Sequence, residues 1–300
     1  MKLLLSLAAV ATLSGCRFWY KPVPVANAIG EEKTVLGGDS VHVFREARFE
    51  VYGPNPEAVY DGYEQLNRAS RTFERHFEAP AARLAVVLDK DTLRPYDVGT
   101  LRGFRDRGFT LVRYMRPRSY RDPTRYGAMG YGGVLWPIAP TAARAMLARF
   151  AAGELQLDGG PASDSAALDR LPVWFRAAII HLIGEGGFPT NDLDYVRDKR
   201  GSLMPLRDVL TLVRPQSADS LLDPSRRTET DETTRLVAAE ASTFARYLVE
   251  REGPGVLGRI AREYLRGRSL TEIIATFQAT PHAFADLEQR WRMWVLTRED

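Results

Sequence analysis

The segment from Thr141 to Gly187 constrains the fold of this 300-residue chain more than any other. Its first part has apolar residues four positions apart, as at Ala142 and Met146, which is the spacing of one helix face. Its second part opens with Pro172 at an expected first helical position and stays largely apolar up to Gly186, which is expected to end the helix. The segment therefore predicts two helices joined by a polar stretch.

These two helices resemble the active-site helices of the gluzincin metallopeptidases, in particular of the peptidase MA-like family, with the sequences TAARAMLARFAAGELQL and LPVWFRAAIIHLIGEGG. In that family the first helix carries HExxH, and the second begins LPxWFxEG and supplies a glutamate as the third zinc ligand. The strand, long helix and strand expected before the pair, and the tail from FARYLVEREG to DLEQRWRMWV, are similar to the same family. The resemblance implies an α+β, zincin-like fold. A small mixed sheet with helices would form the N-terminal lobe over residues 41–140, and residues 141–300 would form a helical C-terminal lobe of the same domain.

The zinc ligands of that family are missing from this chain. Aligned with the family's motif, the first helix has Ala148 and Ala152 in place of the two histidines, and Arg149 in place of the general base. The second helix has Ala177 in place of the third ligand. An alanine methyl group does not bind zinc, and a guanidinium repels it. The resemblance therefore implies a metallopeptidase-like domain with no metal, no cofactor and no catalytic residue.

A relocated metal site is the alternative, in which the protein is an active hydrolase. His181 and Glu185 are four residues apart on the second helix, so both side chains can reach one metal ion. The third ligand would come from His42, His76 or His282, the only other histidines of the chain. The same spacing also suits a structural histidine that compensates the dipole at a helix C-terminus.

The N-terminus has the pattern of a bacterial lipoprotein signal. Lys2 is followed by the apolar run LLLSLAAVATL, which is far shorter than the ~20 residues that span a bilayer. The run leads into Leu13-Ser14-Gly15-Cys16, which resembles the lipoprotein box, and Cys16 is the only cysteine. The resemblance implies a signal peptide over residues 1–15, acylation of Cys16 and a lipid anchor in the bacterial envelope. Arg17, where an aspartate would retain the protein in the inner membrane, favours the outer membrane.

Further patterns divide the rest of the chain. Residues 16–40 contain proline and glycine with little apolar periodicity, so they are expected to form a flexible tether. Asn55-Pro56-Glu57 predicts the start of a long helix, and residues 84–89 predict a buried strand. From Thr228 onward the spacing is helical, with a capping box at Ser269–Glu272 and a last helix expected to start at Thr280-Pro281.

An arginine-rich stretch gives a candidate binding surface. Residues 102–125 contain eight arginines and two aspartates, a local charge of +6, with Tyr114 and Tyr120 between them. Residues 109–114 are expected to form a strand and the following residues a loop. The candidate anion-binding residues are Arg113, Arg116, Arg118, Arg121 and Arg125. They would suit phosphate, lipid headgroups or acidic glycans, whereas the envelope location argues against nucleic acid. A solvated loop is the alternative, because arginine is abundant throughout the chain.

Taken together, these patterns predict a membrane-anchored lipoprotein whose inactive peptidase-like domain binds a peptide or an anionic envelope component. Residues Gly133–Ile138 are expected to provide an open edge strand to which an extended peptide adds. Two alternatives remain: the hydrolase with a relocated metal site, and a structural module that docks to the envelope through its arginine- and tyrosine-rich loop.

Overall fold

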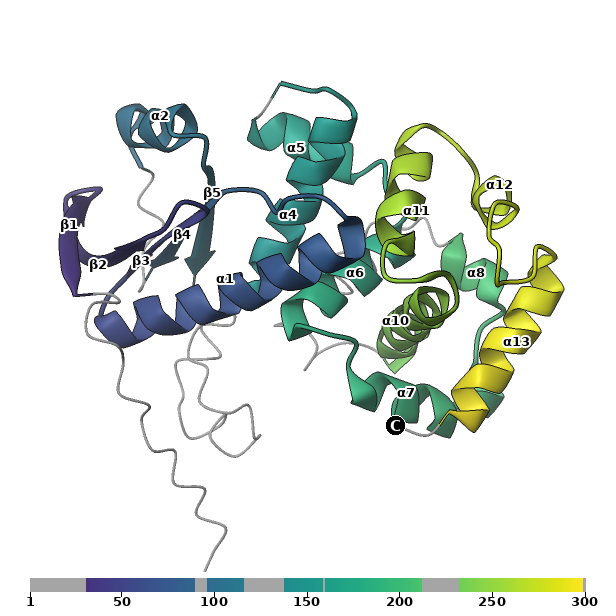
Figure 1. Ribbon diagram of the computed structural model, residues 1–300. Coiled ribbons are helices and arrows are strands. Elements are labelled where there is room, and N and C mark those ends of the chain that lie inside the picture. Colours follow the sequence, from purple (N-terminus) through teal and green to yellow (C-terminus); the bar gives the residue numbers. More distant parts are fainter. Residues whose placement is uncertain (1–30, 90–95, 116–137, 159, 212–231, 299–300) are drawn as a thin grey trace, which may run out of the picture.

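The computed structural model describes residues 31–89, 96–115, 138–158, 160–211 and 232–298. The fold is α+β, as predicted, with a mixed sheet and helices followed by a largely helical part (Figure 1). The strands, in their order across the sheet, are β1 (Glu32–Leu36), β2 (Asp39–Arg45), β3 (Phe49–Gly53), β4 (Leu84–Asp89) and β5 (Thr110–Met115). The pairs β1–β2 and β2–β3 are antiparallel, and the pairs β3–β4 and β4–β5 are parallel.

The first hairpin corrects the predicted tether. Residues 16–40 were expected to be flexible, yet β1 starts at Glu32 and pairs with β2 through Leu36 and Asp39. Gly37 and Gly38 both have positive φ angles, 61° and 89°, as the two central residues of a tight hairpin turn require. The two glycines that suggested flexibility therefore form the turn of a hairpin.

Helix α1 (Pro56–Phe77) covers one face of the sheet. It starts where predicted, because the Asn55 side chain accepts a hydrogen bond of 2.8 Å from the Ala58 N–H. The helix ends at Glu78, which adopts the left-handed conformation with φ of 49°. Its fully buried apolar side chains share one core with alternate residues of β3, β4 and β5.

Helix α2 (Val98–Asp106), which the sequence did not predict, lies on the opposite face of the sheet (Figure 1). Phe104 is its buried residue and packs in a second, smaller core with Tyr52 of β3. On the same face, Glu50 is only 5% exposed and accepts hydrogen bonds from the Tyr52 hydroxyl and from Arg107, at 2.7 and 2.8 Å. Burial, together with the neighbouring Glu50 carboxylate, raises the pKa of Tyr52 to about 12. The ion pair between Arg107 and Glu50 thus ties the end of α2 to the sheet.

The rest of the described chain is helical. Its helices are α4 (Ala139–Glu154), α5 (Pro161–Leu168), α6 (Val173–Glu185), α7 (Thr190–Asp198), the 3-10 turn η2 (Arg200–Ser202), α8 (Leu206–Leu210), α10 (Glu232–Glu252), α11 (Val256–Leu265), α12 (Leu270–Ile274) and α13 (Phe284–Thr297). The two helices predicted between Thr141 and Gly187 correspond to α4 and α6. Pro172 lies one position earlier than predicted, as the N-cap of α6, and Gly186 ends the helix with φ of 74°.

Two predicted boundaries in this region are wrong. The polar stretch between α4 and α6 contains α5, which is short and exposes half of its eight residues, so it lacks a long apolar stripe. The last helix, predicted to start at Pro281, starts at Phe284. A proline favours a helix start but does not fix it, because tertiary contacts decide where the helix begins.

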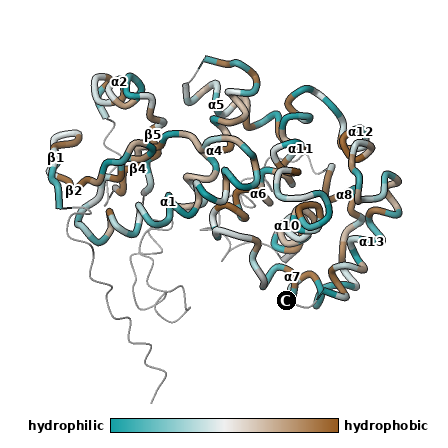
Figure 2. Tube along the Cα trace, viewed as in Figure 1, coloured by the Kyte–Doolittle hydropathy of each residue, from teal (hydrophilic) through white to brown (hydrophobic). Residues whose placement is uncertain are grey.

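Helix α6 is the centre of the helical part. Eleven of its residues are buried, and Figure 2 shows hydrophobic residues along the helix. It packs against α4, α10 and α1, so one continuous core joins the sheet to the helical part. Gly184 allows the end of α6 to lie against the start of α4, since a Cβ at this position would be only 3.1 Å from Pro140 Cγ.

The helical part also contacts the end of α1. Gly258 of α11 lies so close to Phe77 that a Cβ at position 258 would be 2.6 Å from the Phe77 carbonyl oxygen. The Arg262 guanidinium donates a hydrogen bond of 3.0 Å to the same oxygen. This oxygen belongs to the last turn of α1, so Arg262 satisfies a carbonyl that has no partner within its helix.

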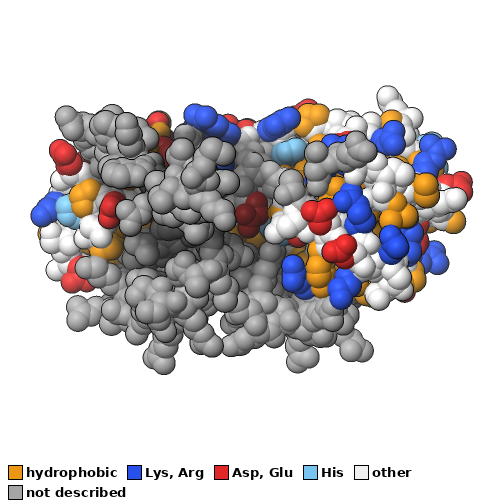
Figure 3. Space-filling view, turned by 90° about the horizontal axis from the view of Figure 1, so that it is seen from below, with side chains coloured by type: hydrophobic (Ala, Val, Ile, Leu, Met, Phe, Trp, Pro, Cys, Tyr) orange, Lys and Arg blue, Asp and Glu red, His pale blue; other side chains and the backbone are white. Residues whose placement is uncertain are grey.

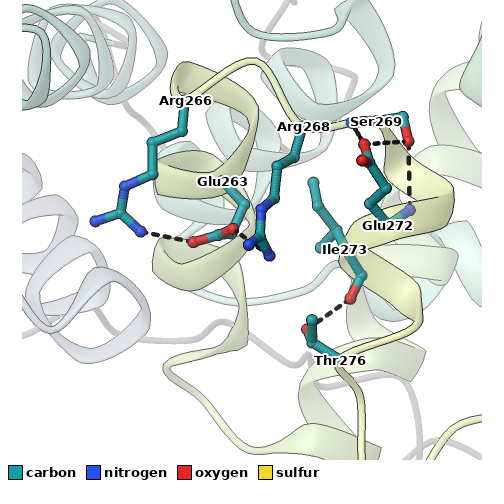
Figure 4. A network of polar contacts seen from close by, with 7 residues as sticks. All are labelled: Glu263, Arg266, Arg268, Ser269, Glu272, Ile273 and Thr276. Carbon is teal, nitrogen blue, oxygen red and sulfur yellow. Dashed lines mark hydrogen bonds and ion pairs between the residues drawn. The ribbon is translucent and has the colours of Figure 1, made fainter.

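Polar contacts fix the turn between α11 and α12 (Figure 4). The predicted capping box is confirmed: the Ser269 side chain accepts from the Glu272 N–H, and the Glu272 carboxylate accepts from the Ser269 N–H. One turn earlier, Glu263 forms ion pairs of 2.6 Å with Arg266 and 3.0 Å with Arg268. Figure 3 shows basic and acidic side chains mixed over the helical part on the face viewed from below.

Among the described helices, none is both long enough and apolar enough to cross a bilayer.

Candidate functional site

A cavity of about 850 Å³ lies between the sheet and the helical part. One wall comes from α2 and from β5 with the residues just before it, and the other comes from α4 and α5. The volume falls within the ~300–1,000 Å³ range of small-molecule sites. A second, smaller hollow of about 150 Å³ is lined by Asp61, Glu64, Gln65 and Arg68 of α1.

The charge around this cavity is strongly positive. Five arginines line it, and Asp164 is the only carboxylate among the lining residues that the structure describes. The arginines on the side of the sheet are Arg83, Arg105 and Arg113, and those on α4 are Arg144 and Arg149. Because charges of one sign lie on both walls, their positive potentials add inside the cavity and favour an anion there.

Aromatic rings orient two of the arginines. The Arg83 guanidinium lies 4.3 Å from the centre of the Phe109 ring, and its Nε donates a hydrogen bond of 3.0 Å to the Ala47 carbonyl. The Arg113 guanidinium lies 4.4 Å from the centre of the Tyr96 ring. Stacking on a ring leaves the positive charge of a guanidinium in place while restricting its motion.

Arg105 and Arg144 carry the least compensated charges of the cavity. Both side chains are exposed, and neither has an ion pair or a side-chain hydrogen bond with any residue in the described ranges. They come from opposite walls, Arg105 from α2 and Arg144 from α4. These two arginines are therefore free to pair with an incoming anion.

Arg149, by contrast, is held in an ion pair. Its guanidinium donates a hydrogen bond of 2.8 Å to Asp164 of α5, whose side chain is only 11% exposed. The pair joins α4 to α5 and fixes the orientation of Arg149 at the cavity wall. Asp164 also offsets part of the positive charge, which lowers the net field of the cavity.

The inner surface of the cavity is apolar. Leu111, Ala145 and Phe150 line it with partly buried side chains, and behind them lie Phe104, Phe109, Val112, Met146 and Leu168. These last five side chains are each less than 9% exposed, so their contacts with the two cores hold them in place. The cavity therefore combines an apolar interior with cationic groups.

The positions that match the zinc ligands of the peptidase MA-like family lie beside this cavity or in the core. Ala148 of α4 lines the cavity and is 7% exposed, and Arg149 follows it as described above. Ala152 is fully buried, and Ala177 of α6 is 5% exposed, both within the main core. Methyl groups and a paired guanidinium thus occupy all four positions.

His181 has a carboxylate partner that the sequence did not reveal. Its Nδ1 lies 3.2 Å from Asp192 Oδ2 on α7, whereas its Nε2 lies 3.9 Å from Glu185 Oε1. His181 is 7% exposed, and the Asp192 side chain is 15% exposed. The contact with Asp192 orients the imidazole and ties α6 to α7.

The other histidines lie in different parts of the fold. His42 is on β2, and His282 has its Nε2 2.9 Å from the Phe277 carbonyl oxygen. His76 has its Nδ1 3.4 Å from the Pro254 carbonyl oxygen, and burial lowers the pKa of its imidazole. Within the described ranges, no three His, Cys, Asp or Glu side chains come together as a metal ion would require.

Several predicted site residues fall outside the described residues. They are Cys16, Arg116, Arg118, Arg121 and Arg125. The predicted edge strand Gly133–Ile138 also lies there except for Ile138, which is buried and is the N-cap of α4 rather than a strand residue. Of the candidate anion-binding set, Arg113 is the residue that the structure places at the cavity.

Sequence reasoning missed Arg83, Arg105, Arg144 and Asp164 as site residues, although Arg105 lies within the arginine-rich stretch. Arg83 and Arg144 lie far from the arginine-rich stretch, and the fold brings them to it through β4 and α4. Asp164 lies on α5, which was not predicted. Arg144 could have been found from the sequence, because it lies on the same predicted helix as Ala148 and Arg149, one turn before Ala148.

Comparisons of this chain with protein-family models, with curated proteins and with solved structures found no match.

Proposed function

We propose that this protein is a lipid-anchored bacterial lipoprotein whose peptidase-like domain does not cleave its ligand but binds it, in the cavity between β5 and α4. The ligand is anionic, either a peptide or another component of the envelope. The observation that carries this proposal is the arrangement of five arginines against one carboxylate around an apolar cavity. No metal or cofactor is part of the proposal.

Electrostatics supports binding of an anion at this place. The two arginines without a described partner, Arg105 and Arg144, lie on opposite walls, so an anion between them gains from both charges. Arg83 and Arg113 extend the positive field along the side of the sheet. A cavity walled by one sign of charge also raises the local concentration of the opposite ion.

The absence of peptidase activity is supported by the residues at the motif positions. Hydrolysis by a zincin needs three protein ligands for the metal and a carboxylate as general base. Ala148, Ala152 and Ala177 provide no ligand atom, and Arg149 is engaged with Asp164. These residues favour a binding role for the cleft.

The proposal is tested by titrating the purified full-length chain with hexaglutamate as a model acidic peptide. We expect the double variant Arg105→Glu with Arg144→Glu to weaken binding at least tenfold at low salt. The control is Arg290→Glu, because Arg290 is also exposed but lies on α13, away from the cavity. Equal affinity of the double variant and the native chain would contradict the proposal.

The anchor is tested separately at Cys16. Replacing Cys16 by serine removes the thiol that would be acylated, so the protein should move from the membrane fraction to the soluble fraction. Mass spectrometry of the mature N-terminus should show the acyl groups in the native chain alone. A native chain without acyl groups would contradict the anchor.

An active hydrolase with a metal at His181 is the second candidate, favoured by the contact with Asp192. Histidines that bind metals often have a carboxylate beside the ring nitrogen that does not bind the metal, and Asp192 Oδ2 lies 3.2 Å from Nδ1. Nε2 and Glu185 would then face the metal. Stoichiometric zinc in the purified protein, lost in His181→Ala, would favour this candidate over the binding role.

An envelope-docking module is the third candidate, and it depends on the arginine-rich stretch itself. Reversing the charges of Arg116, Arg118 and Arg121 should abolish sedimentation with anionic vesicles if this stretch docks to the membrane. Unchanged sedimentation would rule it out.

A further inference from the structure

We infer that the cavity takes a single-chain amphiphile with an anionic head, in which arginines hold the carboxylate or phosphate and the apolar interior holds the alkyl chain. This inference rests on the proposed function, that the cavity binds an anion, and adds the class of ligand. The inference follows from the presence of apolar side chains and of arginines around the same cavity.

The interior suits an alkyl chain better than a peptide backbone. A peptide brings an N–H and a C=O with every residue, and each of these groups needs a partner when it leaves water. The apolar side chains that keep accessible surface at the cavity, among them Leu111, Ala145 and Phe150, offer no hydrogen-bonding group. The uncharged polar side chains of its lining are confined to Thr110, Thr141 and Ser165 among the described residues. An alkyl chain requires no such partners.

The charged groups suit one anionic head. Arg105 and Arg144 are exposed and without a described partner, so they can meet the head where the cavity opens to solvent. A carboxylate or a phosphate accepts hydrogen bonds from a guanidinium in a bidentate geometry. Asp164 already occupies Arg149, which leaves the head to the other arginines.

An exposed leucine continues the apolar surface to the same opening. Leu101 of α2 lines the cavity, and 41% of its surface is exposed. A large apolar side chain at the rim of an apolar cavity is the feature that a chain-like ligand would cover. Leu101 and Arg105 are four residues apart on α2, so they lie on one side of the helix.

The test uses alkyl phosphates from butyl to decyl, titrated into the purified full-length chain by calorimetry below their micelle concentrations. We expect each pair of added methylenes to tighten binding about tenfold, because each buried methylene adds to the transfer free energy. Inorganic phosphate should bind far more weakly than decyl phosphate. Affinity that does not change with chain length would overturn the inference, since it would mean that the head alone is bound.

Two substitutions locate the binding site. Leu101→Glu should weaken the binding of decyl phosphate at least tenfold, because it places a negative charge beside the alkyl chain and the head. The matched control is Leu296→Glu on α13, where the leucine has nearly the same exposure, 43% against 41%. If Leu101→Glu alters the thermal melting curve, Ala145→Phe replaces it, since Ala145 is partly buried and lines the cavity. Equal binding by the cavity variants and the control would overturn the inference.

The outcomes also separate this inference from the function on which it rests. If hexaglutamate binds through Arg105 and Arg144 while decyl phosphate does not bind, the ligand class is wrong and the proposed function stands. If neither ligand binds, both are wrong. If decyl phosphate binds with the expected dependence on chain length and on Arg105 and Arg144, both are supported.

Discussion

The cavity and the C-terminal helices differ in how far their charged side chains form ion pairs. In the helical part, Glu250 pairs with Arg246 and Arg298, and Glu263 pairs with Arg266 and Arg268. Around the cavity, five arginines face a single carboxylate among the described residues. Both regions are rich in arginine, so the abundance of this residue does not distinguish them. What distinguishes them is that two arginines of the cavity, Arg105 and Arg144, have no ion pair with any described residue.

This difference separates charges that serve the fold from charges available to a ligand. A paired and partly buried carboxylate holds elements together and gains little from any further cation. A guanidinium without a partner contributes little to folding but retains its full charge for an incoming anion. The following predictions test this division, from the largest expected effect to the smallest.

The largest effect is expected at Glu252, which joins α10 to the chain before α13. Its carboxylate accepts hydrogen bonds from the Gln278 N–H at 3.0 Å, the Ala279 N–H at 2.8 Å and the Thr280 hydroxyl at 2.9 Å, and its side chain is 3% exposed. Burial opposes ionisation here, but these hydrogen bonds outweigh it and lower the pKa of Glu252. Glu252→Ala leaves three donors without an acceptor, so we expect a loss of about 2–4 kcal/mol in the free energy of unfolding, measured with urea.

The control for this prediction comes from the cavity. Arg144→Ala removes an exposed side chain that has no described partner, so the free energy of unfolding should change by less than about 0.5 kcal/mol. The binding of anions should show the reverse order, with a large effect at Arg144 and none at Glu252. A large loss of stability in Arg144→Ala would break the comparison.

A second prediction concerns Glu240, the exception among the carboxylates of the helical part. It is fully buried, and its Oε1 accepts from the Met204 N–H at 3.1 Å. Burial raises the pKa of Glu240 to about 7, and Glu288 adds to the rise, whereas the Met204 N–H and Arg292 oppose it. The folded protein therefore holds this proton more tightly than the unfolded chain does. The corresponding stability is complete at pH values below about 4.5 and is lost as the pH rises through 7.

Glu240→Gln removes this titration while keeping an oxygen that can accept from Met204. We expect the variant to be more stable than the native chain at pH 8 by about 1–3 kcal/mol, and the gain to shrink toward pH 5. Thermal melting of both proteins between pH 5 and pH 8 gives the comparison. A difference that stays constant over this range would show that Glu240 does not titrate there.

A third prediction changes the charge of the cavity itself. Asp164→Asn removes the carboxylate that offsets Arg149, so the binding of an anionic ligand such as decyl phosphate should become about three- to tenfold tighter. The loss of the ion pair should cost about 1 kcal/mol or less, because the Arg149 side chain is 32% exposed. Calorimetry at two salt concentrations checks the result, since the gain should decrease as salt increases. Weaker binding in this variant would mean that Asp164 orients Arg149 for the ligand rather than competing with it.

The sequence predicted the local elements well where one strong signal was present. Asn55 and Pro56 marked the start of α1, Gly186 marked the end of α6, and the capping box marked α12. Each of these signals depends on the backbone needs of a few neighbouring residues, so the rest of the chain cannot easily override it. The α+β order of elements followed from the same signals.

The cavity could not be predicted in the same way, because its lining comes from segments that are far apart in the chain. Arg83 and Arg144 reach it only through the packing of β4, β5 and α4. The contact between His181 and Asp192 likewise depends on how α7 lies against the helices near α6. Gly37 and Gly38 show that composition can also mislead. Their presence suggested a flexible segment, whereas their positive φ angles belong to a tight hairpin turn. The sequence showed which charged side chains the chain contains, but only tertiary packing determines which of them lie close together.

The smallest effect is expected at Arg266, which sharpens the comparison within the helical part. Its side chain is 64% exposed, and its ion pair with Glu263 spans three residues at the end of α11 (Figure 4). Such a pair contributes little, because solvent screens it and Arg268 remains as a second partner of Glu263. We expect Arg266→Ala to change the free energy of unfolding by less than about 0.5 kcal/mol, as measured with urea. Arg266→Ala and Arg144→Ala should thus be alike in stability, and only Arg144→Ala should weaken the binding of anions. Stability measurements alone therefore do not show whether an exposed arginine belongs to a binding site, whereas measurements of anion binding do.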